Sequence, residues 1–180
     1  MLARPGPDEF AAFYAAYIAR VPDIDDGGDR LGAQRDAVCA LLGTVAEGAS
    51  RFRYAPGKWS VNEVLGHLAD AERVFSYRLL RLARGDETPL AGFDENAYVR
   101  AGGFDARGLE ERRADWRAVR EATLSLVRGL NGSAWEGRGL ANGHLVSARA
   151  LLYIILGHTE HHLEVLRTRY GVGLGGPATR

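Results

Sequence analysis

The run Tyr153-Ile154-Ile155-Leu156-Gly157-His158-Thr159-Glu160-His161-His162-Leu163 places histidines within an apolar helical pattern. The apolar positions around it follow the three-and-four spacing of a buried helix face, and His158 and His162 fall on that face. Because they are four residues apart, they lie one above the other on the same side of the helix. Two imidazoles one turn apart can bind a common metal ion, as in zinc proteins.

A third histidine lies on another expected helix, over residues 60–84. Ser60 and Glu63 match the capping box that starts a helix, and an apolar stripe follows from Val61 to Leu79. His67 lies at the edge of that stripe, so it can point inward if a neighbouring helix is close. A glycine precedes both His67 and His158, at a cost of about 1 kcal/mol relative to alanine. Close helix approach near the histidines would explain these glycines; otherwise they are incidental.

The metal interpretation competes with a plainer one. A single histidine on an apolar face is more often a hydrogen-bonded core residue than a ligand. The pair His158 and His162 makes the two interpretations about equally good, and His67 shifts the balance toward metal. His161 is a rival partner for His158, but its position one step off the stripe favours a rim role. His144, in an expected loop, fits a surface residue better than a ligand.

The ligand set also excludes familiar alternatives. No Glu-x-x-His occurs, as a ferritin-like di-iron bundle needs, and no His-Glu-x-x-His, as a zincin protease needs. The single cysteine, Cys39, rules out a multi-cysteine zinc site. Three histidines leave coordination positions open for water or substrate. Zinc, nickel, iron and manganese all suit imidazole ligands.

The rest of the chain predicts an all-α protein. Sustained strand alternation is absent, and glycine- or proline-marked breaks separate helical patterns. We expect one domain over residues 1–180: a four-helix bundle with a short extra N-terminal helix. The expected helices span about residues 7–20, 30–48, 60–84, 106–130 and 147–170. The expected irregular connections span residues 85–105 and 131–146.

Composition limits the classes of partner. The 180 residues carry 23 basic and 23 acidic side chains, so charge gives no drive toward nucleic acid or an anionic membrane. No segment has the roughly 18 apolar residues of a membrane helix, and the N-terminus does not resemble a signal peptide. The unpaired Cys39 fits a reducing compartment, so we expect a cytoplasmic protein. Residues 171–176 match Gly-x-Gly-x-x-Gly, but without the preceding strand of a dinucleotide-binding loop.

Three runs resemble the DinB/YfiT-like superfamily, which is distinct from the DNA polymerase of similar name. They are Tyr54–Arg73, Phe93–Val99 and Tyr153–Leu163, and the resemblance covers nearly the whole chain. It implies a four-helix bundle with a metal on His67, His158 and His162, commonly nickel or zinc, completed by water. Thr159 departs from the pattern, since many relatives carry glutamate there.

The resemblance implies less about activity. Characterised relatives include S-transferases and isomerases that use bacillithiol or mycothiol, and others look like metal-dependent hydrolases. A bound metal could hold a thiol as thiolate or activate water. We therefore expect a metal-dependent enzyme for a small-molecule substrate, with a non-catalytic stress-response module and a structural metal as the alternative. Only the resemblance suggests a homodimer.

Further residues are candidates for supporting roles. Asp70, Glu160 and His161 are expected to orient the ligands, because each lies within one turn of a histidine. Asp94, Asn96 and Tyr98 lie on the long connection, where binding residues are common, although they could equally fix that loop to the bundle.

Overall fold

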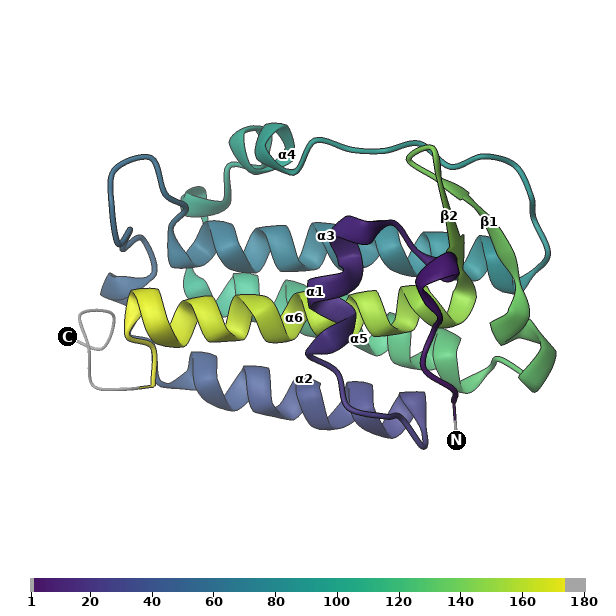
Figure 1. The fold of residues 1–180 in the computed structure, drawn as a ribbon. Helices are drawn as coiled ribbons and strands as arrows, with labels where there is room; N and C mark the ends of the chain where they lie inside the picture. The colour runs from purple at the N-terminus through teal and green to yellow at the C-terminus, as the bar shows by residue number, and fades with distance from the viewer. Residues whose placement is uncertain (1, 174–180) are drawn as a thin grey trace.

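Four long helices lie side by side in the computed structural model, which describes residues 2–173 (Figure 1). They are α2 (Gly27–Gly43), α3 (Val61–Ala83), α5 (Leu109–Arg128) and α6 (Ala148–Tyr170). Helix α3 packs against both α5 and α6, and α2 packs against α5. The architecture is therefore the expected four-helix bundle. None of the helices among these residues is long and apolar enough to cross a membrane.

The two histidine-bearing helices begin at well-formed caps. The Ser60 side chain accepts a hydrogen bond from the Glu63 amide and Glu63 reaches back to the Ser60 amide, so the expected capping box is formed. Ser147 caps α6 through the amide of Ala150. Gly171 ends α6 in the left-handed conformation, with φ of 71°.

The N-terminal segment differs from the expected helix over residues 7–20. It forms two 3₁₀ turns, Pro7–Glu9 and Ala12–Tyr14, and a short helix α1, Ala15–Ala19. The segment crosses over α6 instead of running along the bundle (Figure 1). Glu9 fixes it to the start of α6 through an ion pair with Arg149. Helix α1 is therefore shorter than expected. Its position depends on contacts with α6, which the local sequence does not reveal.

The connection over residues 85–105, expected to be irregular, contains a helix. Helix α4 spans Glu95–Gly102; Asp94 caps it through the amides of Asn96 and Ala97, and Gly103 ends it with φ of 57°. Eight residues are too few for a clear apolar stripe, and this is why the pattern does not reveal the helix.

The connection over residues 131–146, also expected to be irregular, contains a 3₁₀ turn and a β-hairpin. The turn spans Gly132–Glu136, and antiparallel strands β1 (Arg138–Ala141) and β2 (His144–Ser147) follow it. Asn142 and Gly143 join the strands, both with positive φ (53° and 76°), as a tight hairpin turn requires. Four-residue strands are too short for sustained alternation, although the Asn-Gly pair was a usable signal.

Gly66 and Gly157, which precede His67 and His158, allow close packing. The segments that they admit are Phe104 and α1, and the close contact is not between α3 and α6. A Cβ on Gly157 would lie 2.0 Å from the Tyr17 carbonyl oxygen, so this glycine admits the backbone of α1. A Cβ on Gly66 would lie 2.3 Å from the Phe104 ring. Both glycines are therefore needed, for contacts with the segments that cover the bundle.

Candidate metal centre

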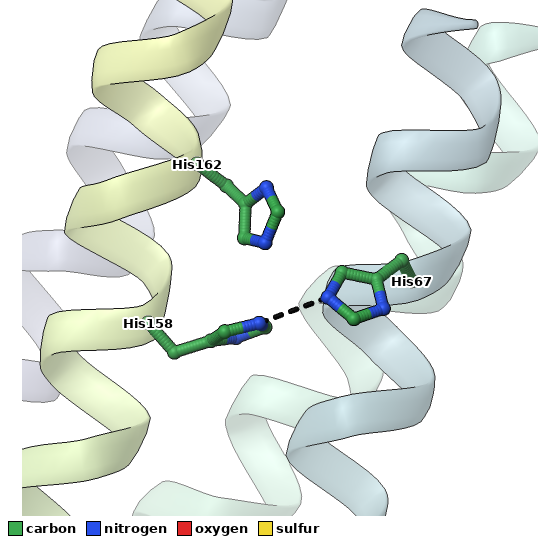
Figure 2. Close-up of side chains that lie close together, drawn as sticks. All are labelled: His67, His158 and His162. Carbon is green, nitrogen blue, oxygen red and sulfur yellow. Dashed lines mark hydrogen bonds between the residues drawn. The ribbon is translucent and has the colours of Figure 1, made fainter. Parts of the chain in front are cut away.

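The three histidines predicted as ligands face one another between α3 and α6 (Figure 2). The Nε2 atoms of His67 and His158 are 2.9 Å apart. One nitrogen from each of the three rings lies within 4.8 Å of the others. The ring centroid of His162 is 4.8 Å from that of His67 and 4.6 Å from that of His158.

Burial keeps these imidazoles neutral. His67, His158 and His162 are 3%, 4% and 9% exposed. Burial, and then the charge of His161, lowers the pKa of His67 to about 4. Burial and the neighbouring histidines hold the pKa values of His158 and His162 well below their usual range. Neutral imidazole is the form that binds metals.

The spacing of the nitrogens fits a transition metal. Two nitrogens bound to one zinc ion at tetrahedral angles lie about 3.3 Å apart, given the usual zinc–nitrogen bond lengths. The observed separations, from 2.9 Å to within 4.8 Å, bracket that value. Small rotations of the three side chains would therefore bring their nitrogens to the spacing that a metal ion requires. The second ring nitrogen of His162, Nδ1, is buried and makes no hydrogen bond within the described chain.

A buried polar network lies beside the histidines and ties all four long helices together. Arg120 of α5 donates to both carboxylate oxygens of Glu72 on α3, at 2.7 and 2.8 Å. It also donates to Gln34 of α2 at 2.8 Å and to the Thr159 hydroxyl of α6 at 3.0 Å. Thr159 therefore belongs to the network that joins the helices.

The expected supporting residues fall in different places. Asp70 accepts a hydrogen bond from Arg73 at 3.1 Å, and Glu160 accepts one from Gln34 at 2.7 Å. Within the described residues, neither carboxylate is hydrogen-bonded to a ligand histidine. His161 packs beside His162, with ring centroids 5.0 Å apart, and its pKa is lowered by burial. Of the three candidates, His161 is the one whose ring packs against a ligand histidine.

A cavity of about 430 Å³ reaches the histidines from one side. His67 and His158 form part of its wall. The N-terminal segment, α3, the start of α4 and the hairpin turn supply the rest: Phe13, Tyr14, Tyr17, Ala71, Phe75, Arg78, Phe93, Asp94, Glu95 and Asn142. Burial raises the pKa values of both Tyr14 and Tyr17, so these phenols are neutral hydrogen-bonding groups. The cavity combines aromatic walls with a few polar groups, as small-molecule sites do.

A smaller cavity of about 280 Å³ reaches His162 from the other side. It is lined by His161, His162, Trp59, Asn96 and Tyr170, among others. Of the three residues singled out on the long connection, Asp94 and Asn96 each line a cavity, while Tyr98 is 46% exposed. Asp94 also caps α4, a contact within the long connection itself.

Sequence reasoning missed Arg78, Tyr14 and Tyr17. Arg78 lies three residues after Phe75 on the inward stripe of α3, and a charge at such a position was a usable signal. The two tyrosines carried no comparable signal, because their positions depend on how the N-terminal segment crosses α6.

Comparison with known proteins identifies the family. The model of the DinB superfamily matches residues 11–166, so the chain belongs to this superfamily. No protein of curated function matches the chain.

Solved structures that share the fold include YfiT and a mycothiol-dependent isomerase. YfiT from Bacillus subtilis, described as a probable metal-dependent hydrolase with an unusual four-helix bundle topology, is 20% identical, with a TM-score of 0.68 over 85% of this chain and 93% of YfiT. A mycothiol-dependent maleylpyruvate isomerase is 16% identical, with a TM-score of 0.65 over 87% of this chain. This chain spans 63% of the isomerase.

Proposed function

We propose that this DinB superfamily member binds one divalent transition metal, nickel or zinc, on His67, His158 and His162 and is a metal-dependent enzyme for a small molecule. The observation that carries the proposal is the convergence of three buried, neutral imidazoles beside a cavity. A single histidine in a core satisfies itself with a hydrogen bond, whereas three converging rings with lowered pKa values match a metal site.

Within this class, transfer of a thiol is the reaction that the site favours. A bound metal would hold a thiol as its thiolate at neutral pH. This step needs no separate base, and the carboxylates within three residues of a ligand, Asp70, Glu160 and Glu164, are occupied by Arg73, Gln34 and Arg20. The likeness to a mycothiol-dependent isomerase is compatible with this choice.

Hydrolysis is the second candidate, because YfiT is described as a probable hydrolase and a bound metal also lowers the pKa of water. In both cases the chain's own residues have the same tasks. The histidines hold the metal, the aromatic wall of the cavity excludes bulk water, and Tyr14 and Tyr17 offer neutral hydroxyls to the ligand. The proposed location is the cytoplasm.

Elemental analysis of protein purified without added metal tests the proposal. We expect about one nickel or zinc per chain, retained by the wild type and lost on His158→Ala. Cobalt-substituted protein should then gain a thiolate-to-cobalt absorption band with mercaptoethanol. Retention of no more than trace metal, even after zinc is added, would refute the metal site.

The alternative of a structural metal has its own signature. Metal removal would then lower the unfolding temperature sharply, while thiols give no new band and a panel of electrophiles and esters shows no turnover. An ester that is hydrolysed without thiol would select the second candidate.

A further inference from the structure

A buried arginine, Arg78, lies in the wall of the larger cavity without an acidic partner. It is 3% exposed, and its Nη2 donates to the carbonyl oxygen of Ala91 at 2.8 Å. Within residues 2–173, no carboxylate lies within 4.0 Å of its guanidinium. A guanidinium has five N–H donors. The partners that the structure gives it, the Ala91 carbonyl oxygen and the Tyr14 hydroxyl, are both neutral, so neither supplies a countercharge.

The neighbours of Arg78 do not neutralise it. The Tyr14 hydroxyl lies close to the guanidinium, but burial raises the pKa of this phenol, which stays neutral. Phe75 lies against the guanidinium, with the ring centroid 5.9 Å away. Asp94 and Glu95 line the same cavity from exposed positions, and within residues 2–173 neither forms an ion pair with Arg78. The Glu95 charge reaches Tyr14, where it adds to the effect of burial in raising the pKa of the phenol. Arg120, in contrast, is equally buried but holds Glu72 in a bidentate pair.

The position of Arg78 relates it to the histidines. Phe75, beside Arg78, also packs edge-on against His158, with ring centroids 5.7 Å apart. Arg78 and His158 both line the larger cavity. A ligand that enters this cavity can therefore meet both His158 and Arg78.

We infer that Arg78 binds a carboxylate group of the small molecule that this cavity accepts. The ligand class is a low-molecular-weight thiol that carries a carboxylate, with the sulfur toward the histidines. Planar guanidinium groups bind carboxylates through two parallel hydrogen bonds, and such pairs are strong where water is excluded. The position of the sulfur rests on the proposed function, in which the histidines hold a metal that binds a thiol. The position of the carboxylate rests on Arg78 alone.

Matched ligand pairs test the inference. Straight-chain mercapto acids, from mercaptoacetate to mercaptohexanoate, are titrated into cobalt-substituted wild-type protein beside the mercapto alcohols of equal length. We expect at least one acid to bind about tenfold or more tightly than its alcohol, the size of one charge-assisted contact. Arg78→Met should abolish this preference and leave the affinity for the alcohol unchanged. Arg81→Met is the matched control, because Arg81 lies one turn further along α3 and pairs with Asp86.

The outcomes separate this inference from the proposed function. If thiols bind but no acid is preferred over its alcohol in the wild type, the inference is wrong while the metal–thiol proposal stands; this comparison needs no variant to fold. If no thiol binds, the proposed thiol function fails, and calorimetry with hexanoate and hexanol then decides on Arg78. Tighter hexanoate binding in the wild type than in Arg78→Met supports the carboxylate site, and equal binding overturns it.

Discussion

The Nε2 atoms of His67 and His158 lie 2.9 Å apart, although 91 residues separate them in the chain. A contact of this kind exists only when α3 and α6 are packed together. It brings the lone imidazole of α3 to the pair on α6, and the three-histidine site is therefore a product of the tertiary fold.

Removal of either partner in this contact should weaken metal binding strongly. We expect His67→Ala and His158→Ala each to weaken zinc binding by more than about 100-fold, beyond the effect of losing a supporting partner. His144→Ala, on strand β2 outside the histidine cluster, is the control and should bind zinc like the wild type. Calorimetric zinc titration measures the difference. Equal binding by His67→Ala and the wild type would remove His67 from the ligand set.

The Glu72–Arg120 pair predicts a non-additive effect on stability. Glu72→Leu leaves the fully buried Arg120 charge without its partner, at a cost of about 3–5 kcal/mol of unfolding free energy. The double variant Glu72→Leu/Arg120→Met removes both charges and should lose less than Glu72→Leu alone. Urea unfolding of the three proteins measures this. A double variant that is less stable than the single one would show that the pair is net stabilising over apolar packing.

Two glycine-to-alanine variants should shift stability in opposite directions. In Gly157→Ala the new methyl group would collide with the Tyr17 backbone, 2.0 Å from its carbonyl oxygen, and should cost about 1–3 kcal/mol. Gly32, inside α2, has no atom within 4 Å of the corresponding position, so Gly32→Ala should gain about 0.5–1 kcal/mol. Thermal or urea unfolding gives both values. A neutral Gly157→Ala would mean that α1 moves away easily, and ligand binding in the cavity should then change instead.

Glu9 should make the attachment of the N-terminal segment pH-dependent. The Arg149 guanidinium, which donates to the Glu9 carboxylate, lowers its pKa from 4.5 to about 2. The unfolded chain therefore binds a proton at higher pH than the folded protein does, so this carboxylate stabilises the fold above pH 4.5 and stops doing so as pH falls toward 2. The stability difference between wild type and Glu9→Gln should be largest near pH 7 and shrink over that interval. A difference that stays constant with pH would exclude the ion pair as its cause.

Much of the bundle could be predicted from local patterns. The caps at Ser60 and Ser147 mark the starts of α3 and α6, and the expected starts lie within one residue of Val61 and Ala148. Helical phase alone places His158 and His162 on the buried face of α6. These features depend on residues within a few turns of each other, where spacing along the chain fixes spacing in space.

Short elements were harder, because their stability comes from contacts outside themselves. Helix α1 and the hairpin are held by α6 and by the long connection; for example, Leu90 exchanges backbone hydrogen bonds with Leu140 and Asn142. For this reason residues 7–20 form two 3₁₀ turns and the short helix α1 in place of one continuous helix. The Asn142-Gly143 turn was the one local signal of the hairpin.

The sequence by itself therefore determined the long helices, the inward phase of His158 and His162, and the family motifs. For His67, helical phase gave only a place at the edge of its stripe and the resemblance implied a ligand role; the tertiary structure places its ring beside the other two. Only the tertiary structure decided that Asp70 and Glu160 bond to Arg73 and Gln34, and that Arg78 faces the larger cavity beside Tyr14. The physical reason is that periodicity fixes the face on which a side chain lies within one helix. What that face meets depends on packing between segments far apart in the chain.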